Sequence, residues 1–154
     1  MSEHSERQSS KPNPALKPLD ALVGKWNTAG THPLFPDATL RGRVSFEWLE
    51  GGAFLIMYSD VEQPGPPSAI AVFGRDDSVE RYSMLYFDER GVSRIYEMSL
   101  SGSVWKMWRN SPGFSQRFTG TFSDDGNTIT GVWELSKDDS NWEHDLQLTY
   151  TRDR

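Results

Sequence analysis

Two histidines stand where an imidazole could bind a ligand or carry a proton. His144 lies in segment 142–152, in which apolar and polar residues alternate. Such alternation is typical of a strand with one buried face, and it predicts that His144 points inward together with Tyr150. His32 is in phase with Trp26 on an earlier predicted strand, so we expect both histidines at one open end of the fold. The simpler alternative is a rim histidine that bonds a neighbouring group or water.

A metal site built only from side chains is not predicted. Catalytic metal centres usually have three protein ligands, whereas the chain has 3 histidines and no cysteine. One of the histidines, His4, falls in a polar N-terminal segment. Asp60 or Asp88 could complete a set with His32 and His144, but no spacing requires it.

Aromatic, methionine and arginine side chains share faces on the later predicted strands. The candidate ligand-binding residues there are Tyr82, Met84, Tyr86, Arg94, Tyr96, Trp105 and Trp133. An interior lined by such groups suits a mostly apolar ligand, and an arginine would hold its anionic end. Arg109 and Arg117 are further candidates for this anion. The alternative is that the aromatic and methionine side chains fill a solid core while the arginines lie outside.

Common catalytic motifs are missing from the sequence. It contains no Gly-x-Ser-x-Gly, Gly-rich phosphate loop, dinucleotide fingerprint or calcium-loop spacing. The paired aspartates at 76–77, 124–125 and 138–139 fit turns rather than an acid–base pair. The sequence therefore identifies no catalytic residue, and whether the protein is an enzyme stays open.

Composition limits the class of protein. The 154 residues fit one domain, and the net charge of -6 argues against nucleic acid and against a polybasic membrane anchor. No apolar run approaches the ~20 residues of a membrane helix. The N-terminus lacks the basic and apolar regions of a signal peptide. We therefore expect a cytoplasmic protein, monomeric or weakly dimeric, without disulfides and with no nucleic-acid or membrane partner.

The N-terminal segment 1–17 is polar and buries too little apolar surface to offset the entropy of ordering. We expect a disordered or loosely docked tail there and a single folded domain over 18–154. Apolar residues within 19–23 have the spacing of a helical face, and Gly24 suits a helix end. This pattern predicts a short helical plug across one end of the domain.

The remaining chain predicts an all-β fold of about ten strands separated by turns rich in Gly, Pro, Asn and Asp. No helix is predicted between the strands, so neighbouring strands must be antiparallel. Closure into an up-and-down barrel would remove the unpaired sheet edges. A β-sandwich is the competing architecture, but its usual long Greek-key return is not found. The predicted strands span 26–31, 44–48, 53–61, 68–74, 81–88, 92–100, 104–109, 115–122, 128–135 and 142–152.

Three segments resemble the calycin superfamily, which includes lipocalins, fatty-acid-binding proteins and nitrobindin-like domains. The segments are Leu22-Val23-Gly24-Lys25-Trp26, Leu49-Glu50-Gly51-Gly52-Ala53-Phe54, and the ending from Trp142-Glu143-His144-Asp145 to Tyr150-Thr151-Arg152. The resemblance covers 19–152 and is nearest to uncharacterised bacterial calycin-like domains. In lipocalins the tryptophan of the Gly-x-Trp motif lies at the closed end of the barrel, under a basic side chain of the last strand. The resemblance thus assigns barrel closure to Gly24, Trp26, Tyr150 and Arg152, with a cation–π contact.

Three functions of different classes are compatible with such a barrel. Resemblance to fatty-acid-binding proteins implies a small hydrophobic ligand whose carboxylate meets an arginine and a tyrosine, and this is the leading hypothesis. Resemblance to nitrobindin-like proteins implies haem bound through His144, with peroxynitrite or nitric-oxide chemistry. The glycine-rich first strand of that family, ending in Tyr-Pro, is replaced here by the segment 27–33. The third, an isomerase or cyclase with its site in the barrel mouth, would use Tyr, Arg or His as acid or base.

Overall fold

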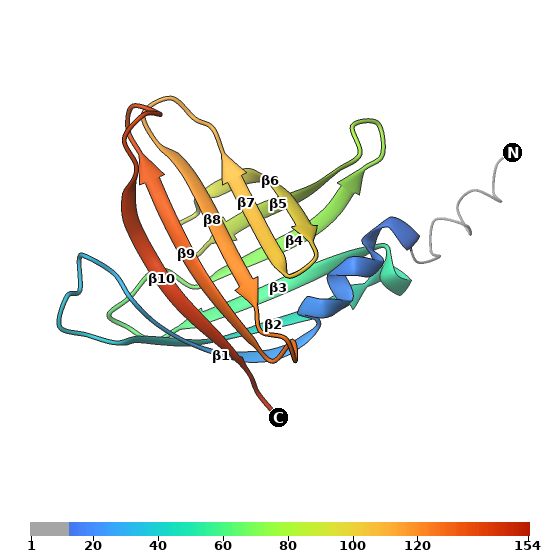
Figure 1. Ribbon diagram of the computed structural model, residues 1–154, viewed down its shortest axis with the longest axis horizontal. Helices are drawn as coiled ribbons and strands as arrows, with labels where there is room; N and C mark the ends of the chain where they lie inside the picture. The colour runs from blue at the N-terminus through green and yellow to red at the C-terminus, as the bar shows by residue number, and fades with distance from the viewer. Residues whose placement is uncertain (1–12) are drawn as a thin grey trace, which may run out of the picture.

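The computed structural model describes residues 13–154 (Figure 1). Residues 1–12, which make up most of the predicted tail, lie outside the described residues. The described chain forms ten strands and two 3₁₀ helices. In order these are η1 (Pro14–Leu22), β1 (Gly24–Thr31), β2 (Leu40–Leu49), η2 (Glu50–Gly52), β3 (Phe54–Val61), β4 (Ala69–Asp76), β5 (Arg81–Asp88), β6 (Ser93–Ser101), β7 (Val104–Arg109), β8 (Ser115–Phe122), β9 (Thr128–Ser136) and β10 (Glu143–Arg152).

The ten strands form a closed antiparallel barrel in which every strand pairs with its neighbours in the sequence. The first and last strands complete the closure, with Trp26 of β1 opposite Arg152 of β10. Figure 1 shows the strands as one curved wall, with η1 beside one end of it. The predicted all-β, up-and-down barrel is therefore confirmed and the sandwich alternative is wrong. Closure leaves this sheet without an unpaired edge.

The helical plug is longer than the sequence pattern predicted. It begins at Pro14, and the Asn13 side chain caps it by accepting a hydrogen bond from the Ala15 N–H at 3.0 Å. Leu16, Leu19 and Leu22 recur every three residues, which is the period of a 3₁₀ helix, and all three are fully buried. The prediction used an α-helical spacing within 19–23 and so missed the first turn.

Trp26 and Arg152 close the barrel under this plug. The Trp26 indole N–H donates to the carbonyl of Leu22 at 2.8 Å, and the Arg152 guanidinium lies 4.1 Å from the centre of the tryptophan ring. Arg152 also donates to the carbonyl of Val23 at 2.7 Å. Gly24 has φ +125°, and a Cβ there would lie 2.8 Å from Arg152 Nη1, so a glycine is required. These contacts attach the plug to the first and last strands.

Aromatic side chains fill the half of the barrel next to η1. Phe46, Phe73, Phe118 and Trp105 are at most 1% exposed, and the ring centres of Trp105 and Phe118 are 4.8 Å apart. Gly131 gives the Phe118 ring its space, because a Cβ there would lie 2.6 Å from the ring. This half agrees with the solid-core alternative, whereas the other half is hollow.

A β-bulge interrupts the last strand and changes which face its residues occupy. From Gln147 to Thr151, β10 pairs regularly with β9. The register shifts between His144 and Gln147, near the start of the strand. The extra residue places His144 opposite Glu134, whose side chain bonds Arg117 on the outside of the barrel. The predicted alternation therefore holds from Leu148 to Arg152 and fails at His144, because a bulge inverts the phase of a strand.

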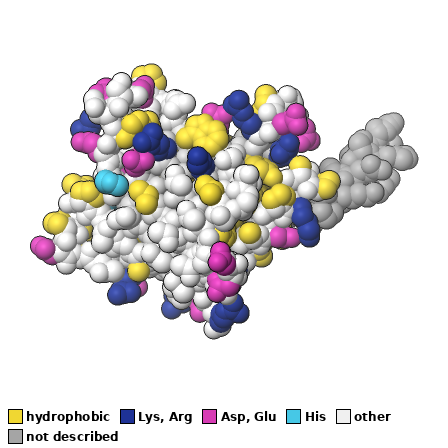
Figure 2. All heavy atoms as spheres, viewed as in Figure 1, with side chains coloured by type: hydrophobic (Ala, Val, Ile, Leu, Met, Phe, Trp, Pro, Cys, Tyr) yellow, Lys and Arg dark blue, Asp and Glu magenta, His cyan; other side chains and the backbone are white. Residues whose placement is uncertain are grey.

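The outer surface carries charges of both signs. Figure 2 shows lysine, arginine, aspartate and glutamate side chains intermixed on one face. Ion pairs such as Arg81–Glu97 and Arg117–Glu134 connect neighbouring strands, and exposed pairs of this kind contribute ~0–1 kcal/mol each. Within residues 13–154, no helix has both the length and the apolar character needed to span a membrane.

Candidate ligand-binding site

The hollow half of the barrel contains a cavity of about 720 Å³. Its lining includes Leu34, Pro66 and Lys137, which lie in loops at the end away from η1, so the mouth lies at that end. The apolar lining residues include Leu40, Val44, Met57, Met84, Trp105, Met107, Phe114, Trp133, Leu135 and Leu148. A mostly apolar cavity of this size is typical of a site for a small hydrophobic molecule.

Arg94 is the cationic side chain best placed to meet an anionic ligand. It lines the cavity on β6, opposite Tyr86 of β5, and its guanidinium lies 5.2 Å from the centre of the Phe114 ring. Arg94 forms no ion pair with a carboxylate of the described chain. Its planar donors therefore remain available for a bidentate contact with a ligand carboxylate.

Tyr96 and Gln116 add polar groups close to Arg94. The Tyr96 hydroxyl donates to Gln116 Oε1 at 2.7 Å, and both residues are buried. Burial raises the pKa of Tyr96, and the positive charges of Arg94 and Arg109 partly oppose this rise. Tyr96 thus stays protonated near neutral pH, and its donated hydrogen bond fixes the carbonyl side of the Gln116 amide. The amide nitrogen of Gln116 is left as a donor for a ligand.

A second tyrosine of the cavity belongs to a carboxylate–arginine cluster. The Tyr86 hydroxyl donates to Asp88 Oδ2 at 2.7 Å, and Arg90 Nη2 donates to the same oxygen at 2.7 Å. The Arg90 guanidinium holds the pKa of Asp88 well below its usual range, whereas burial and the Asp88 carboxylate raise the pKa of Tyr86. Asp88 neutralises Arg90, which leaves Arg94 as the freer cation.

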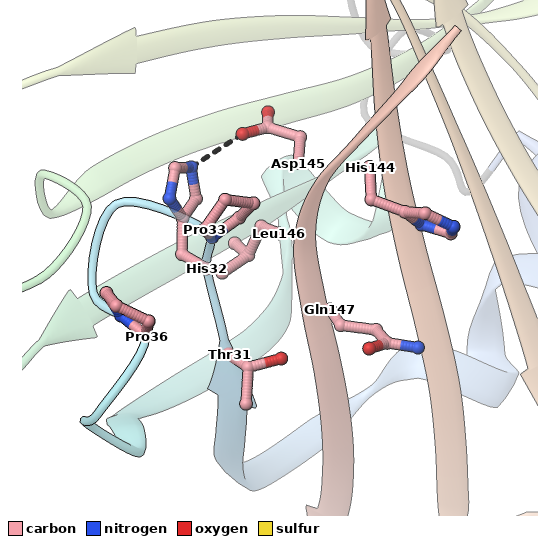
Figure 3. A pocket seen from close by; sticks show the side chains of 8 residues that line it. All are labelled: Thr31, His32, Pro33, Pro36, His144, Asp145, Leu146 and Gln147. Carbon is pink, nitrogen blue, oxygen red and sulfur yellow. Dashed lines mark hydrogen bonds and ion pairs between the residues drawn. The ribbon is translucent and has the colours of Figure 1, made fainter.

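His32 and Asp145 connect two segments at the mouth. His32 Nε2 lies 2.6 Å from Asp145 Oδ1, and the backbone N–H of Leu34 donates to His32 Nδ1 at 3.0 Å. Because Nδ1 accepts, a neutral imidazole carries its proton on Nε2 and donates it to Asp145. Both ring nitrogens are therefore used, and the pair joins the loop after β1 to the bulge of β10. This contact borders a smaller hollow of about 270 Å³ (Figure 3).

His144 is placed differently from its prediction. Its side chain is exposed, and Figure 3 shows His144 and Gln147 on one side of β10, with Asp145 and His32 on the other. His144 reaches the rim of both hollows, but the expected histidine pair is not formed. The bulge gives the inward position near the mouth to Asp145 instead, and Asp145 takes His32 as its partner.

These residues do not fit haem ligation. An axial ligand needs a histidine nitrogen that is free and directed into the cavity. His144 lies on the outer row of β10, and both nitrogens of His32 are engaged by Asp145 and Leu34. No function is therefore derived through haem. Residues 13–154 also contain no group of three His, Cys, Asp or Glu side chains suited to a metal ion.

Most of the predicted cavity residues share one cavity, and three predicted candidates lie elsewhere. Those that line the cavity are His32, Met84, Tyr86, Arg94, Tyr96, Trp105 and Trp133, with His144 at its rim. Tyr82 starts β5 at the closed end, where its hydroxyl donates to the carbonyl of Ala15 at 2.8 Å. Arg117 stacks on Trp142 at 3.9 Å on the outside, because it is one position out of phase with the inward Gln116. Arg109 donates to the carbonyl of Phe114 at 3.1 Å.

Sequence patterns did not identify three residues of the site, which are Gln116, Phe114 and Asp145. Gln116 is in phase with Phe118, a signal that could have placed it inside. Phe114 sits in the turn before β8, where no periodicity applies. Asp145 was assigned to the outer face, and only the bulge brings it to His32.

Comparisons with known proteins show the fold. No protein-family profile matches the chain, and no curated protein matches it. Among solved structures, the chain is similar to "Crystal Structure of Rv2717c from M. tuberculosis", with a TM-score of 0.62 and 16% sequence identity. The match covers 94% of this chain and 100% of that chain. A ten-strand antiparallel barrel with this neighbour is consistent with a calycin-like fold.

Proposed function

We propose that this protein binds a small hydrophobic molecule with an anionic end inside the barrel. The observation that carries the proposal is the 720 Å³ cavity with an unpaired arginine in its wall. Apolar side chains of the cavity remove the ligand chain from water, at roughly 25 cal/mol per Å² of apolar surface buried. Arg94 then receives the anionic group and fixes the orientation of the ligand.

The polar groups around Arg94 support a carboxylate rather than a neutral head group. The Tyr96 hydroxyl donates to the Gln116 carbonyl oxygen, which leaves the Gln116 amide nitrogen as a donor for a carboxylate, and Phe114 covers one face of the Arg94 guanidinium. A charge that is partly removed from water needs a counter-charge and hydrogen bonds. A bound carboxylate would supply both to Arg94.

The test compares decanoate with decanol, which have the same chain and differ in charge. We expect decanoate to bind with one site per chain and the variant Arg94→Met to lose about 10- to 100-fold in affinity for it, because a charge-assisted hydrogen bond contributes ~1.5–3 kcal/mol. Decanol affinity should change little in the variant. Arg117→Met on the outer face is the matched control. Equal affinity of wild type and Arg94→Met for decanoate, measured by calorimetry, would contradict the proposal.

A second candidate is an isomerase-type enzyme with its site in the barrel mouth. The observation in its favour is that two acid–base pairs, His32–Asp145 and Tyr86–Asp88, lie at the cavity. Tyr86 would exchange its hydrogen bond to Asp88 for one donated to a substrate oxygen, and Asp145 would accept a proton from carbon.

Deuterium exchange separates this candidate from simple binding. A probe such as 4-oxodecanoate places a ketone near the mouth, and its incubation with the protein in D₂O should give enzyme-dependent deuteration beside the carbonyl. Asp145→Asn should abolish the exchange and Asp139→Asn, in an outer loop, should not. Exchange at the rate of buffer alone would remove the second candidate.

A further inference from the structure

Next to the floor of the cavity, one buried hydrogen-bond donor has no partner in the described chain, and one hydroxyl makes no hydrogen bond to it. The Trp105 indole N–H is buried and has no partner in the described chain. The Tyr150 hydroxyl, on a residue only 6% exposed, makes no hydrogen bond that involves the described residues either. Both residues line the cavity, and their ring centres lie 6.0 Å apart. Buried polar groups are nearly always paired in native proteins, so the unpaired Trp105 N–H beside the Tyr150 hydroxyl needs an explanation.

We propose that the ligand carries a neutral oxygen acceptor, such as a ketone carbonyl, at the end opposite its anionic group, and that Trp105 and Tyr150 bind it. This inference rests on the proposed function, because it concerns the same cavity. An indole N–H can only donate, so the ligand atom that satisfies it must be an acceptor. The Tyr150 hydroxyl can donate a second hydrogen bond to the same ligand oxygen.

The surroundings of the floor determine that the acceptor is uncharged. Phe46 and Phe118 pack against Trp105, with ring centres 6.1 and 4.8 Å away. The lysine and arginine side chains among the described lining residues are Arg41, Arg90, Arg94 and Lys137, and all four belong to the end of the barrel away from η1. Burial among aromatic rings without a counter-cation strongly disfavours an ionised carboxylate, whereas a carbonyl needs only hydrogen bonds. The anionic end therefore stays at the mouth and the neutral oxygen reaches the floor.

Strand geometry gives the distance from the floor to the level of Tyr96, the polar residue next to Arg94 on the inner face of β6. Trp105 pairs with Leu100 across β6 and β7, and Leu100 is four residues from Tyr96 along β6. At about 3.3 Å per residue, the two levels are ~13 Å apart. A medium-length extended chain spans this distance, so the ligand class is an oxo-acid with its carbonyl near the far end.

The experiment compares decanoate with 9-oxodecanoate, a chain of the same length with a methyl ketone at the far end. We expect the wild-type protein to bind 9-oxodecanoate about fivefold more tightly, the effect of one typical hydrogen bond. Trp105→Phe should remove this preference, so that the ratio of the two affinities falls from about five to about one. Trp48→Phe is the matched control, since the Trp48 indole N–H bonds Asp20 outside the cavity, and it should retain the preference. Tyr150→Phe should reduce the preference in part.

An NMR measurement on the wild-type protein avoids dependence on the folding of the variants. The Trp105 indole N–H signal should move downfield with 9-oxodecanoate and not with decanoate. Equal affinities for the two ligands, or a preference that survives in Trp105→Phe, would overturn the assignment of the floor while the proposed function stands. Failure of both ligands to bind would overturn both.

Discussion

At the scale of single residues, the function follows from which polar groups have partners and which do not. His32, Asp88 and Arg90 are held by neighbours of the same chain. Arg94 lines the cavity without an ion-pair partner among the described residues, and the buried Trp105 indole N–H has no hydrogen-bond partner there. An unsatisfied buried donor such as the Trp105 N–H lowers the free energy of unfolding by ~1–3 kcal/mol, so this unpaired group is destabilising. The groups that remain unpaired are the ones available to a ligand.

The face of a strand on which a residue lies could be predicted from the sequence better than its contacts with distant residues. Alternation within uninterrupted strands predicted that Met84 and Tyr86 share one face and that Tyr96 lies on a matching face of the next strand, and the structure turns these faces inward. His144 was misplaced because a bulge has no reliable signature in a polar segment such as 142–147. The contact between His32 and Asp145 joins positions 113 residues apart, and local periodicity carries no information about it.

The buried tyrosines predict a loss of stability at alkaline pH. Burial raises the pKa of Tyr150 above the 10.0 of a free tyrosine, so above about pH 10 the unfolded chain releases a proton that the folded chain retains. The contribution of these tyrosines to the free energy of unfolding should therefore be constant below that pH and fall above it. Tyr150→Phe should make this fall shallower, with Tyr86 and Tyr96 responsible for the remainder. Urea unfolding at pH 7 and pH 11 measures it, and an unchanged slope would contradict the account.

At the scale of elements, η1 determines which end of the barrel is closed. Its leucines are fully buried against the aromatic half, and Arg152 and Trp26 connect it to β10 and β1. The sequence predicted a plug at this place because the apolar spacing is local. It missed the helix start at Pro14, because the stretch before Pro18 is polar overall and only Leu16 marks the additional turn.

Removal of one leucine of the plug should destabilise the whole barrel. Leu19→Ala leaves a void at a fully buried position, and such truncations typically cost 2–5 kcal/mol. Lys17→Ala, on the exposed face of the same helix with its side chain 80% exposed, is the matched control and should change the unfolding free energy by less than about 0.5 kcal/mol. Urea denaturation of both variants measures the difference. Similar values for the two would show that η1 is not docked as described.

At the scale of the whole molecule, the barrel divides into a filled half and a hollow half. Phe46, Phe73 and Phe118 fill the closed end, while methionines and tyrosines line the open end around 720 Å³. The ten-strand barrel could be predicted because strand spacing and turns are local signals. The boundary between filled and hollow halves could not, because the same alternation places large side chains inside at both ends. That boundary places Trp105 and Tyr150 at the floor and Arg94 near the mouth.

Native mass spectrometry of the wild-type protein titrated with decanoate tests the central claim most directly. We expect a saturable complex of one decanoate per chain. Under the same conditions, neither decanol with the folded protein nor decanoate with the acid-unfolded protein should give a complex of comparable stability. A spectrum that shows only the free chain, or adducts that increase in number without saturation, would contradict the proposal that the hollow half of the barrel is a binding site for an anionic hydrophobic molecule.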